Sequence, residues 1–140
     1  MSDRYFLDTN VLVYALTKSD LSKRAVAMRL LTDAIESGKG IISFQIVHEF
    51  FSVAFRRFNP TLTLAEAEQF LAMPLRPLLV VHSSYSLYSQ ALRLAHQHSI
   101  SWYDSLIVAA ALEAECRILY TEDLQHGQKL DNLRIQNPFL

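Results

Sequence analysis

Short apolar segments alternate with amphipathic helical segments along almost the whole of this 140-residue chain, and this alternation constrains the fold more than any other feature. Short apolar runs bounded by polar or turn-forming residues are typical of buried strands. The predicted strands cover residues 5–7, 41–43, 78–81 and 117–120, with a last short strand near 133–135. Strands separated by helices predict a three-layer α/β/α fold around a mostly parallel sheet. The length suits one domain, and we expect residues 1–140 to form it.

Capping residues and helix breakers delimit the helices between these strands. Gly38 stands where a helix is expected to end, and Ser43 and Ser101 stand where N-caps are expected. Thr63 and Glu66 have the spacing of a capping box. The predicted helices run from the "DTN" turn to Leu16, over 21–37, over 44–58, from 63–66 to about Met73, over 84–96, and from Trp102 onward. In such folds ligands bind beyond the carboxyl ends of the strands, so the residues that follow each strand are the candidates for function.

The composition excludes several classes of protein. With 51% hydrophobic and 19% charged residues, the chain is expected to build a well-filled core, and its net charge of −1 argues against a protein that passively coats nucleic acid. The single Cys116 excludes an intramolecular disulfide and a cysteine-rich zinc site. The longest apolar run, Leu106–Leu112, is too short to span a bilayer, and no signal peptide precedes the first strand. We therefore expect a soluble, cytoplasmic protein with no membrane association.

Two acidic residues follow predicted strands directly. Asp8 comes after "YFL", and Asp123 follows "RILY" within "YTEDLQHG", next to Glu122. Taken singly, Asp8 has the position of an N-cap and Asp123 that of an ordinary loop acid. The carboxyl ends of parallel strands meet at one edge of a sheet, so the two carboxylates are also placed to share a site.

Two further acidic residues lie on helices. Glu49 belongs to a polar stripe on the helix 44–58, and this stripe is either solvated or the floor of a cleft. Asp104 stands three residues after Ser101, a capping-box spacing that also favours an acid near the positive end of the helix dipole. Its own side of that helix is otherwise apolar. The residues that define these faces are Gln45, Ser52 and Arg56 beside Glu49, and Ile107, Val108 and Ala111 beside Asp104.

A divalent cation would explain how the carboxylates of these four acids can lie together in one cleft. Carboxylates gathered in one cleft repel one another and raise one another's pKa values. A half-buried carboxylate such as Asp104 is also costly unless it is paired or bound to a metal. Mg²⁺ and Mn²⁺ prefer oxygen ligands, so either ion would offset both costs.

Other chemistries fail on residue spacing. The sequence "HEFFS" over 48–52 starts like a zinc-protease motif, but Ser52 stands where the second histidine is needed. No glycine-rich phosphate loop or nucleophile elbow is present. Arg56 and Arg57 form a small basic spot, and Arg56 lies on the stripe of Glu49, where it is placed to meet a phosphate. The phenylalanines of the helix 44–58 suit a core or a surface for self-association, with Phe55 off the main apolar face.

Four segments in order, "FLDTNVLVYAL", "ISFQIVHEFFSVAFRR", "ISWYDSLIVAAAL" and "LYTEDLQHG", resemble the PIN-domain nucleases, and most closely the VapC-type toxins of toxin–antitoxin pairs. The resemblance covers essentially the whole chain. It implies a parallel sheet flanked by helices and a metal-dependent endoribonuclease that leaves 5′-phosphate and 3′-hydroxyl ends. It also implies a homodimer and a small antitoxin partner that covers the cleft.

The resemblance assigns residues of this chain to the family's site. The acids that hold one or two Mg²⁺ or Mn²⁺ ions are Asp8, Glu49, Asp104 and Asp123, the last preferred over Glu122 because it fits a Thr/Ser-x-Asp pattern. The polar residues that support these carboxylates or the phosphate are Thr9, Asn10, Ser43 and Thr121.

Two other functions remain open on the sequence alone. One is an α/β phosphatase or phosphotransfer domain with Asp8 as nucleophile, although "DTN" lacks the second aspartate two residues on. The other is a catalytically silent binding module with the same fold, against which the presence of all four acids argues.

Overall fold

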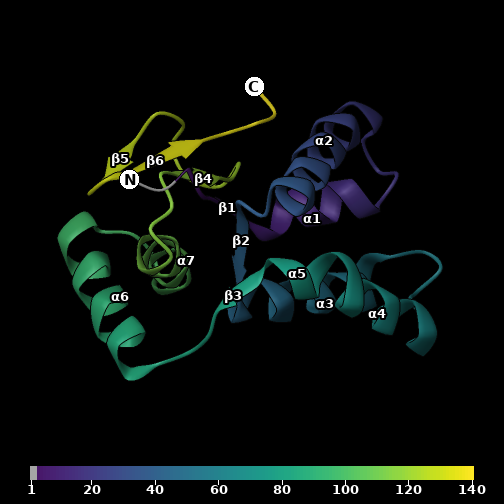
Figure 1. Ribbon diagram of the computed structural model, residues 1–140, viewed down its shortest axis with the longest axis horizontal. Helices are drawn as coiled ribbons and strands as arrows, with labels where there is room; N and C mark the ends of the chain where they lie inside the picture. Colours follow the sequence, from purple (N-terminus) through teal and green to yellow (C-terminus); the bar gives the residue numbers. More distant parts are fainter. Residues whose placement is uncertain (1–2) are drawn as a thin grey trace.

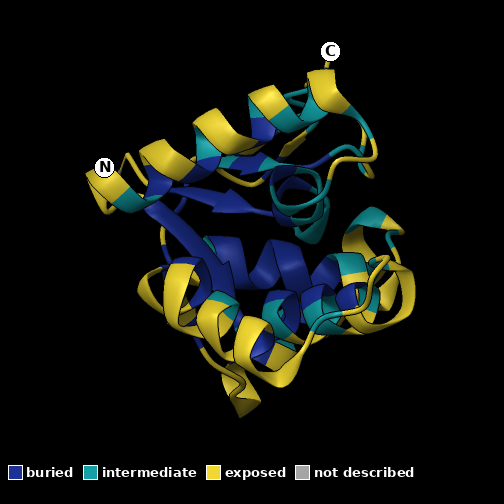
Figure 2. Cartoon of the chain, turned by 90° about the vertical axis from the view of Figure 1, so that its right-hand side faces the viewer, coloured by how far each residue is buried: buried dark blue, intermediate teal, exposed yellow. Residues whose placement is uncertain are grey.

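The computed structural model describes residues 3–140, which form a six-stranded sheet with helices on both faces (Figures 1 and 2). The strands lie in the spatial order β3-β2-β1-β4-β6-β5. Their bounds are β1 Tyr5–Leu7, β2 Gly40–Ser43, β3 Leu79–Val81, β4 Ile118–Tyr120, β5 Lys129–Leu130 and β6 Leu133–Gln136. All pairs are parallel except β5 with β6. The predicted three-layer fold with a mostly parallel sheet is confirmed.

The helices fill the connections between the strands, as the alternating pattern predicts. Their bounds are α1 Thr9–Leu16, α2 Leu21–Ser37, α3 Phe44–Arg57, α4 Leu64–Phe70, a π-helical turn Leu71–Leu75, α5 Arg76–Leu78, α6 Tyr85–His98 and α7 Trp102–Glu113. Gly38 ends α2 in the left-handed conformation, and the capping box of Thr63 and Glu66 opens α4. Among residues 3–140, no helix combines the length and apolar character that a membrane span needs.

The register of the central strands brings their carboxyl ends to one level. Leu7 of β1 pairs with Tyr120 of β4, and the backbone N–H of Asp8 donates to the carbonyl of Tyr120 at 3.1 Å. On the other side, β1 pairs with β2, which ends at Ser43. The residues after these three strands therefore lie at the same edge of the sheet.

Helix α7 is buried on nearly all sides, and this position explains its composition. Every residue from Ser105 to Ala111 is buried, because α7 lies between the sheet and α6. A helix that is apolar all round suits such a place. Asp104 occupies the first turn of α7, at the end where the buried part begins.

Some predicted details differ from the structure. The strand 78–81, predicted to be buried, is the edge strand β3, and Val80 is 47% exposed because a neighbour covers only one side. The helix after Thr63 is regular only to Phe70, since Met73 precedes a proline and adopts non-helical angles. Strand β5 was not predicted, because two residues carry no pattern of their own.

Candidate active site

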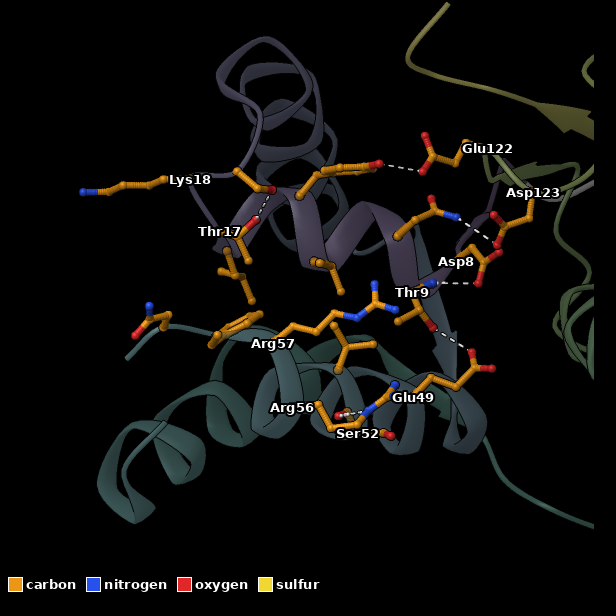
Figure 3. A pocket seen from close by; sticks show the side chains of 18 of the residues that line it. Asp8, Thr9, Thr17, Lys18, Glu49, Ser52, Arg56, Arg57, Glu122 and Asp123 are labelled. Atoms are coloured by element: carbon orange, nitrogen blue, oxygen red, sulfur yellow. Dashed lines mark hydrogen bonds between the residues drawn. The ribbon is translucent and has the colours of Figure 1, made fainter. Parts of the chain in front are cut away.

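A cleft of about 1030 Å³ opens at the carboxyl edge of the sheet, between α1, α3, α7 and the loop after β4 (Figure 3). Its lining includes the four predicted acids, Asp8, Glu49, Asp104 and Asp123. The predicted Thr9, Asn10 and Arg56 also line it. Ser43 and Thr121 are fully buried and do not line the cleft.

Asp8 is the most deeply placed of the four acids, with only 4% of its surface exposed. One carboxylate oxygen accepts from the backbone N–H of Thr9 at 2.7 Å, and the other accepts from the hydroxyl of Thr121 at 2.7 Å. Burial raises the pKa of Asp8 to about 7, and the negative charges of Asp123 and Glu49 add to the rise, although both hydrogen bonds oppose it. Without a nearby cation, this carboxylate is therefore poised to take up a proton near neutral pH.

Thr121 and Asn10 connect Asp8 to Asp123. The hydroxyl of Thr121, which donates to Asp8, accepts from the backbone N–H of Asp123 at 3.0 Å. The amide of Asn10 donates to the carboxylate of Asp123 at 3.3 Å and to the Thr121 hydroxyl at 3.4 Å. Partial burial and the charges of Glu122 and Asp104 raise the pKa of Asp123, while the hydrogen bond from Asn10 lowers it. The two aspartates therefore belong to one hydrogen-bonded group.

Glu122 also lines the cleft, but both of its carboxylate oxygens already have partners. The hydroxyl of Tyr14 donates to one at 2.7 Å, and the ammonium of Lys23 pairs with the other at 3.0 Å. Lys23 also donates to the Tyr14 hydroxyl at 3.2 Å. This arrangement ties the loop after β4 to α1 and α2. Of the two adjacent acids, Asp123 is the one that is linked to Asp8.

Glu49 is oriented by residues on both sides of the cleft. The hydroxyl of Thr9 in α1 donates to one carboxylate oxygen at 2.7 Å, and the amide of Gln45 donates to the other at 3.3 Å. Gln45 also donates to the backbone carbonyl of Tyr103 in α7 at 3.2 Å. Gln45 was expected on a polar stripe with Glu49, yet it is buried because α7 packs over it. The end of the stripe that contains Gln45 is therefore buried, whereas Ser52 and Arg56 at its other end are exposed.

Asp104 reaches the cleft from the amino end of α7. Its backbone N–H donates to the hydroxyl of Ser101 at 3.1 Å, so the predicted N-cap is present. Its side chain is half-buried beside Ile107, which also lines the cleft. Ser43, by contrast, occupies the N-cap position of α3 without a side-chain cap hydrogen bond, and its buried hydroxyl has no partner.

The donor set of the cleft fits a hard divalent cation. Five carboxylates line one cavity, and burial, together with the negative charges of Asp123 and Glu49, raises the pKa of Asp8. The buried amide oxygen of Asn10 also lacks a partner and supplies a further oxygen at the same place. In the described conformation no three acidic, histidine or cysteine side chains of residues 3–140 lie close enough to surround one ion. The fit therefore rests on ligand chemistry and shared location.

Three basic residues also line the cleft, and the sequence had indicated two of them. Arg56 and Arg57 were predicted to form a basic spot, and Lys18 joins them in the lining. The sequence reasoning missed Gln45 as a partner of Glu49, although it lies one helical turn before it, a spacing at which side chains meet. It also missed the contacts of Tyr14 and Lys23, for which no local signal exists.

The fold and the cleft define an α/β protein with an acidic site at the carboxyl edge of a parallel sheet. The sequence matches the PIN domain family over residues 5–129, nearly the whole chain. The chain therefore belongs to the PIN-domain family. No curated protein matches the sequence.

Solved structures with a similar fold include three from bacteria. A toxin–antitoxin complex from Klebsiella pneumoniae contains a chain that is 20% identical, with a TM-score of 0.67 over 96% of this chain and 97% of that one. VapC20 of Mycobacterium tuberculosis, described as a toxin that cleaves the sarcin–ricin loop, is 20% identical, with a TM-score of 0.65 over 85% and 89%. VapBC2 of Rickettsia felis, bound to promoter DNA, has a chain that is 21% identical, with a TM-score of 0.65 over 95% and 97%. At these identities the likeness concerns the fold.

Proposed function

We propose that this protein is a metal-dependent endoribonuclease and the toxin component of a toxin–antitoxin pair. The observation that carries the proposal is the meeting of four carboxylates in one cleft, contributed by four separate segments of the chain. These acids are Asp8, Glu49, Asp104 and Asp123, and we assign them as the ligands of Mg²⁺ or Mn²⁺.

The chain's own residues hold these ligands in place. Thr9 and Thr121 orient Asp8 through hydrogen bonds to its two oxygens. The Thr9 hydroxyl holds Glu49, and Asn10 holds Asp123. Hydrogen-bond partners of this kind fix the direction of a metal-binding carboxylate. Removing one typically lowers metal affinity or activity by about 10–100-fold. Ser43, at the N-cap position of α3, is buried, and Arg56 lines the cleft with its Nε donating to the backbone carbonyl of Ser52, so we assign neither a direct contact with the substrate.

Hydrolysis of an RNA phosphodiester is the reaction that this site suits. A bound Mg²⁺ or Mn²⁺ would lower the pKa of a water molecule and neutralise the charge that develops on the phosphate. In this hydrolysis a water oxygen would bond to phosphorus as the bond to the 3′ oxygen breaks, and the 3′ oxygen would take up a proton. The products carry a 5′-phosphate and a 3′-hydroxyl.

The similar solved structures support the biological part of the proposal. One is a sarcin–ricin loop cleaving toxin, one is a toxin–antitoxin complex, and one is VapBC2 bound to promoter DNA. We infer a cognate antitoxin partner and a structured RNA substrate for this chain on that basis. We also infer a homodimer, for which the surface of α3 offers Phe55, 54% exposed and stacked on Phe51.

The sequence around Asp8 speaks against a phosphatase that uses it as a nucleophile. The segment "DTN" lacks the second aspartate two residues on that haloacid-dehalogenase-like phosphatases carry. A silent binding module stays the alternative that the experiment below distinguishes.

Cleavage of a panel of transfer and ribosomal RNAs by the purified chain tests the proposal. We expect discrete cuts with Mg²⁺ or Mn²⁺, none with a chelator, and loss of cleavage by at least about 100-fold in Asp8→Asn and Asp104→Asn. Glu113→Gln is the matched control, because it neutralises an exposed carboxylate at the far end of α7. Cuts that persist equally in Asp8→Asn would contradict the metal site, and Mn²⁺ binding without any cleavage would favour a binding module.

A further inference from the structure

The cleft is lined by side chains of both charges. Its lining contains the four carboxylates assigned above and also Lys18, Arg56 and Arg57. The whole chain has a net charge of −1, so general electrostatic attraction does not supply affinity for RNA. Any attraction for a phosphate backbone must therefore come from cations placed at the site.

The three basic residues are not equivalent, as Figure 3 shows. Lys18 points away from the cleft, and the Nε of Arg56 donates to the backbone carbonyl of Ser52 at 3.0 Å within its own helix. Arg57, at the end of α3, extends into the cleft and directs its guanidinium toward the end where Thr9 and Glu49 lie. Arg57 is therefore the cation that the fold aims into the site.

The guanidinium of Arg57 has no partner among residues 3–140. The ion pairs of this part of the chain join Lys23 to Glu122, and Lys39 and Arg117 to Asp3. No hydrogen bond of Arg57 to a side chain or carbonyl is present either. An arginine that faces carboxylates ordinarily forms a two-pronged pair with one of them. Its donors are instead free for a ligand.

We infer that Arg57 binds the phosphate of the RNA strand that neighbours the cleaved one, and so sets the path of the substrate along α1 and α3. This inference rests on the proposed function. Two N–H groups of a guanidinium match two oxygens of one phosphate. Arg57 stands at the end of α3, beside open solvent, so there is room for the RNA strand to continue past it. Arg57 is thus a substrate-binding residue, distinct from Arg56, whose side chain is turned back onto α3.

Binding of single-stranded RNA in the absence of cleavage tests the inference. The probe is a fluorescein-labelled dodecameric oligouridylate, and its anisotropy is measured with Mg²⁺ at about 50 to 200 mM KCl in the Asp8→Asn background. We expect Arg57→Gln to weaken binding about tenfold at the lowest salt. We also expect the slope of log affinity against log salt to fall in magnitude by about 0.7, because one phosphate contact is lost.

Three further variants separate this contact from charge in general. Arg29→Gln removes the same charge from an exposed arginine of α2 outside the cleft, and we expect less than about a twofold effect. Arg57→Lys keeps the charge but not the fork, so the salt slope should remain while affinity falls. Arg56→Gln should keep the salt slope of the parent. Equal effects of Arg57→Gln and Arg29→Gln, or a larger change of slope in Arg56→Gln, would overturn the inference.

The outcome is separable from that of the proposed function. Asp8-dependent cleavage together with unchanged binding by Arg57→Gln would leave the nuclease proposal standing and reject the role of Arg57. A specific loss of binding in Arg57→Gln, with no RNA cleaved by the parent chain, would support the phosphate contact and reject the nuclease. Thermal unfolding of each variant checks that the fold is intact, as expected for an exposed side chain.

Discussion

Asp8 is the residue at which stability and function oppose each other most directly. It lies at the end of β1, buried among hydrogen-bond donors, and its pKa of about 7 means that ionising it in the folded chain is costly. Thr9 and Thr121 reduce that cost without removing it. A carboxylate kept in such a place is typical of a functional site rather than of a stabilising cap.

The pH dependence of stability follows from this pKa. Between about pH 4 and pH 7 the folded chain holds a proton on Asp8 that the unfolded chain has released, so the free energy of unfolding falls as pH rises through this range. With a chelator present, we expect Asp8 to lower stability at pH 8 relative to pH 4 by at most about 4 kcal/mol. Asp8→Asn should remove this part of the dependence and raise the melting temperature at pH 8.

Thermal unfolding of the parent and Asp8→Asn across that pH range, with Glu113→Gln as control, measures the effect. Identical pH profiles for the parent and Asp8→Asn would show that burial of this carboxylate carries no such cost.

At the scale of elements, the site depends on the close contact between α2 and the start of β2. Gly40 begins β2, and a Cβ atom there would lie 2.8 Å from the Cα of Ala34 and closer still to its side chain. Both residues are buried, so neither can move into solvent. Glycine and alanine at these positions let α2 lie directly against the strand whose end leads into Ser43 and α3.

Gly40→Ala should therefore destabilise the fold by about 1–3 kcal/mol, because α2 must shift away from the sheet to admit one methyl group. Urea denaturation of the variant gives the value. Gly38→Asn is the matched control, since Gly38 has a positive φ that asparagine tolerates and no atom within 4 Å of the added Cβ. A cost no larger than that of Gly38→Asn would show that the contact is not tight.

At the scale of the whole molecule, the site joins segments that are distant in the chain. Its acids stand at positions 8, 49, 104 and 123, on β1's carboxyl end, α3, α7 and the loop after β4. A ligand held by all four segments is bound by the folded chain and not by the unfolded one. Any such ligand raises the free energy of unfolding in proportion to the logarithm of its concentration.

Mn²⁺ or Mg²⁺ should therefore stabilise the protein against heat. At a concentration about 100 times the dissociation constant, we expect a gain of about 2.7 kcal/mol. Asp104→Asn should lose most of this gain, whereas Arg29→Gln should keep it. Differential scanning calorimetry with and without a chelator measures the gain, and the absence of any metal-dependent change at pH 8 would contradict the ligand assignment.

The sequence predicted the secondary structure well wherever the signal was local. The strands 5–7 and 117–120 and the helix 21–37 follow from apolar runs and from Gly38, which are features of neighbouring residues. The order of strands in the sheet carried no such signal. The segment 78–81 looks like an interior strand, and only the pairing of β2 with β1 and β3 leaves it at an edge.

Within the candidate site, local sequence patterns were enough to predict which residue types stand at the carboxyl ends of the strands and in the first turn of α7. Their partners follow only from how the segments pack: Asp123 is linked to Asp8, Glu122 pairs with Lys23, and Gln45 is buried beneath α7. The tertiary structure also decided that Arg57 rather than Arg56 points into the cleft. The physical reason is the distance along the chain over which each effect acts. Caps and periodicity act over a few residues of one segment, whereas the direction of a long side chain depends on packing between segments that meet only when the chain is folded.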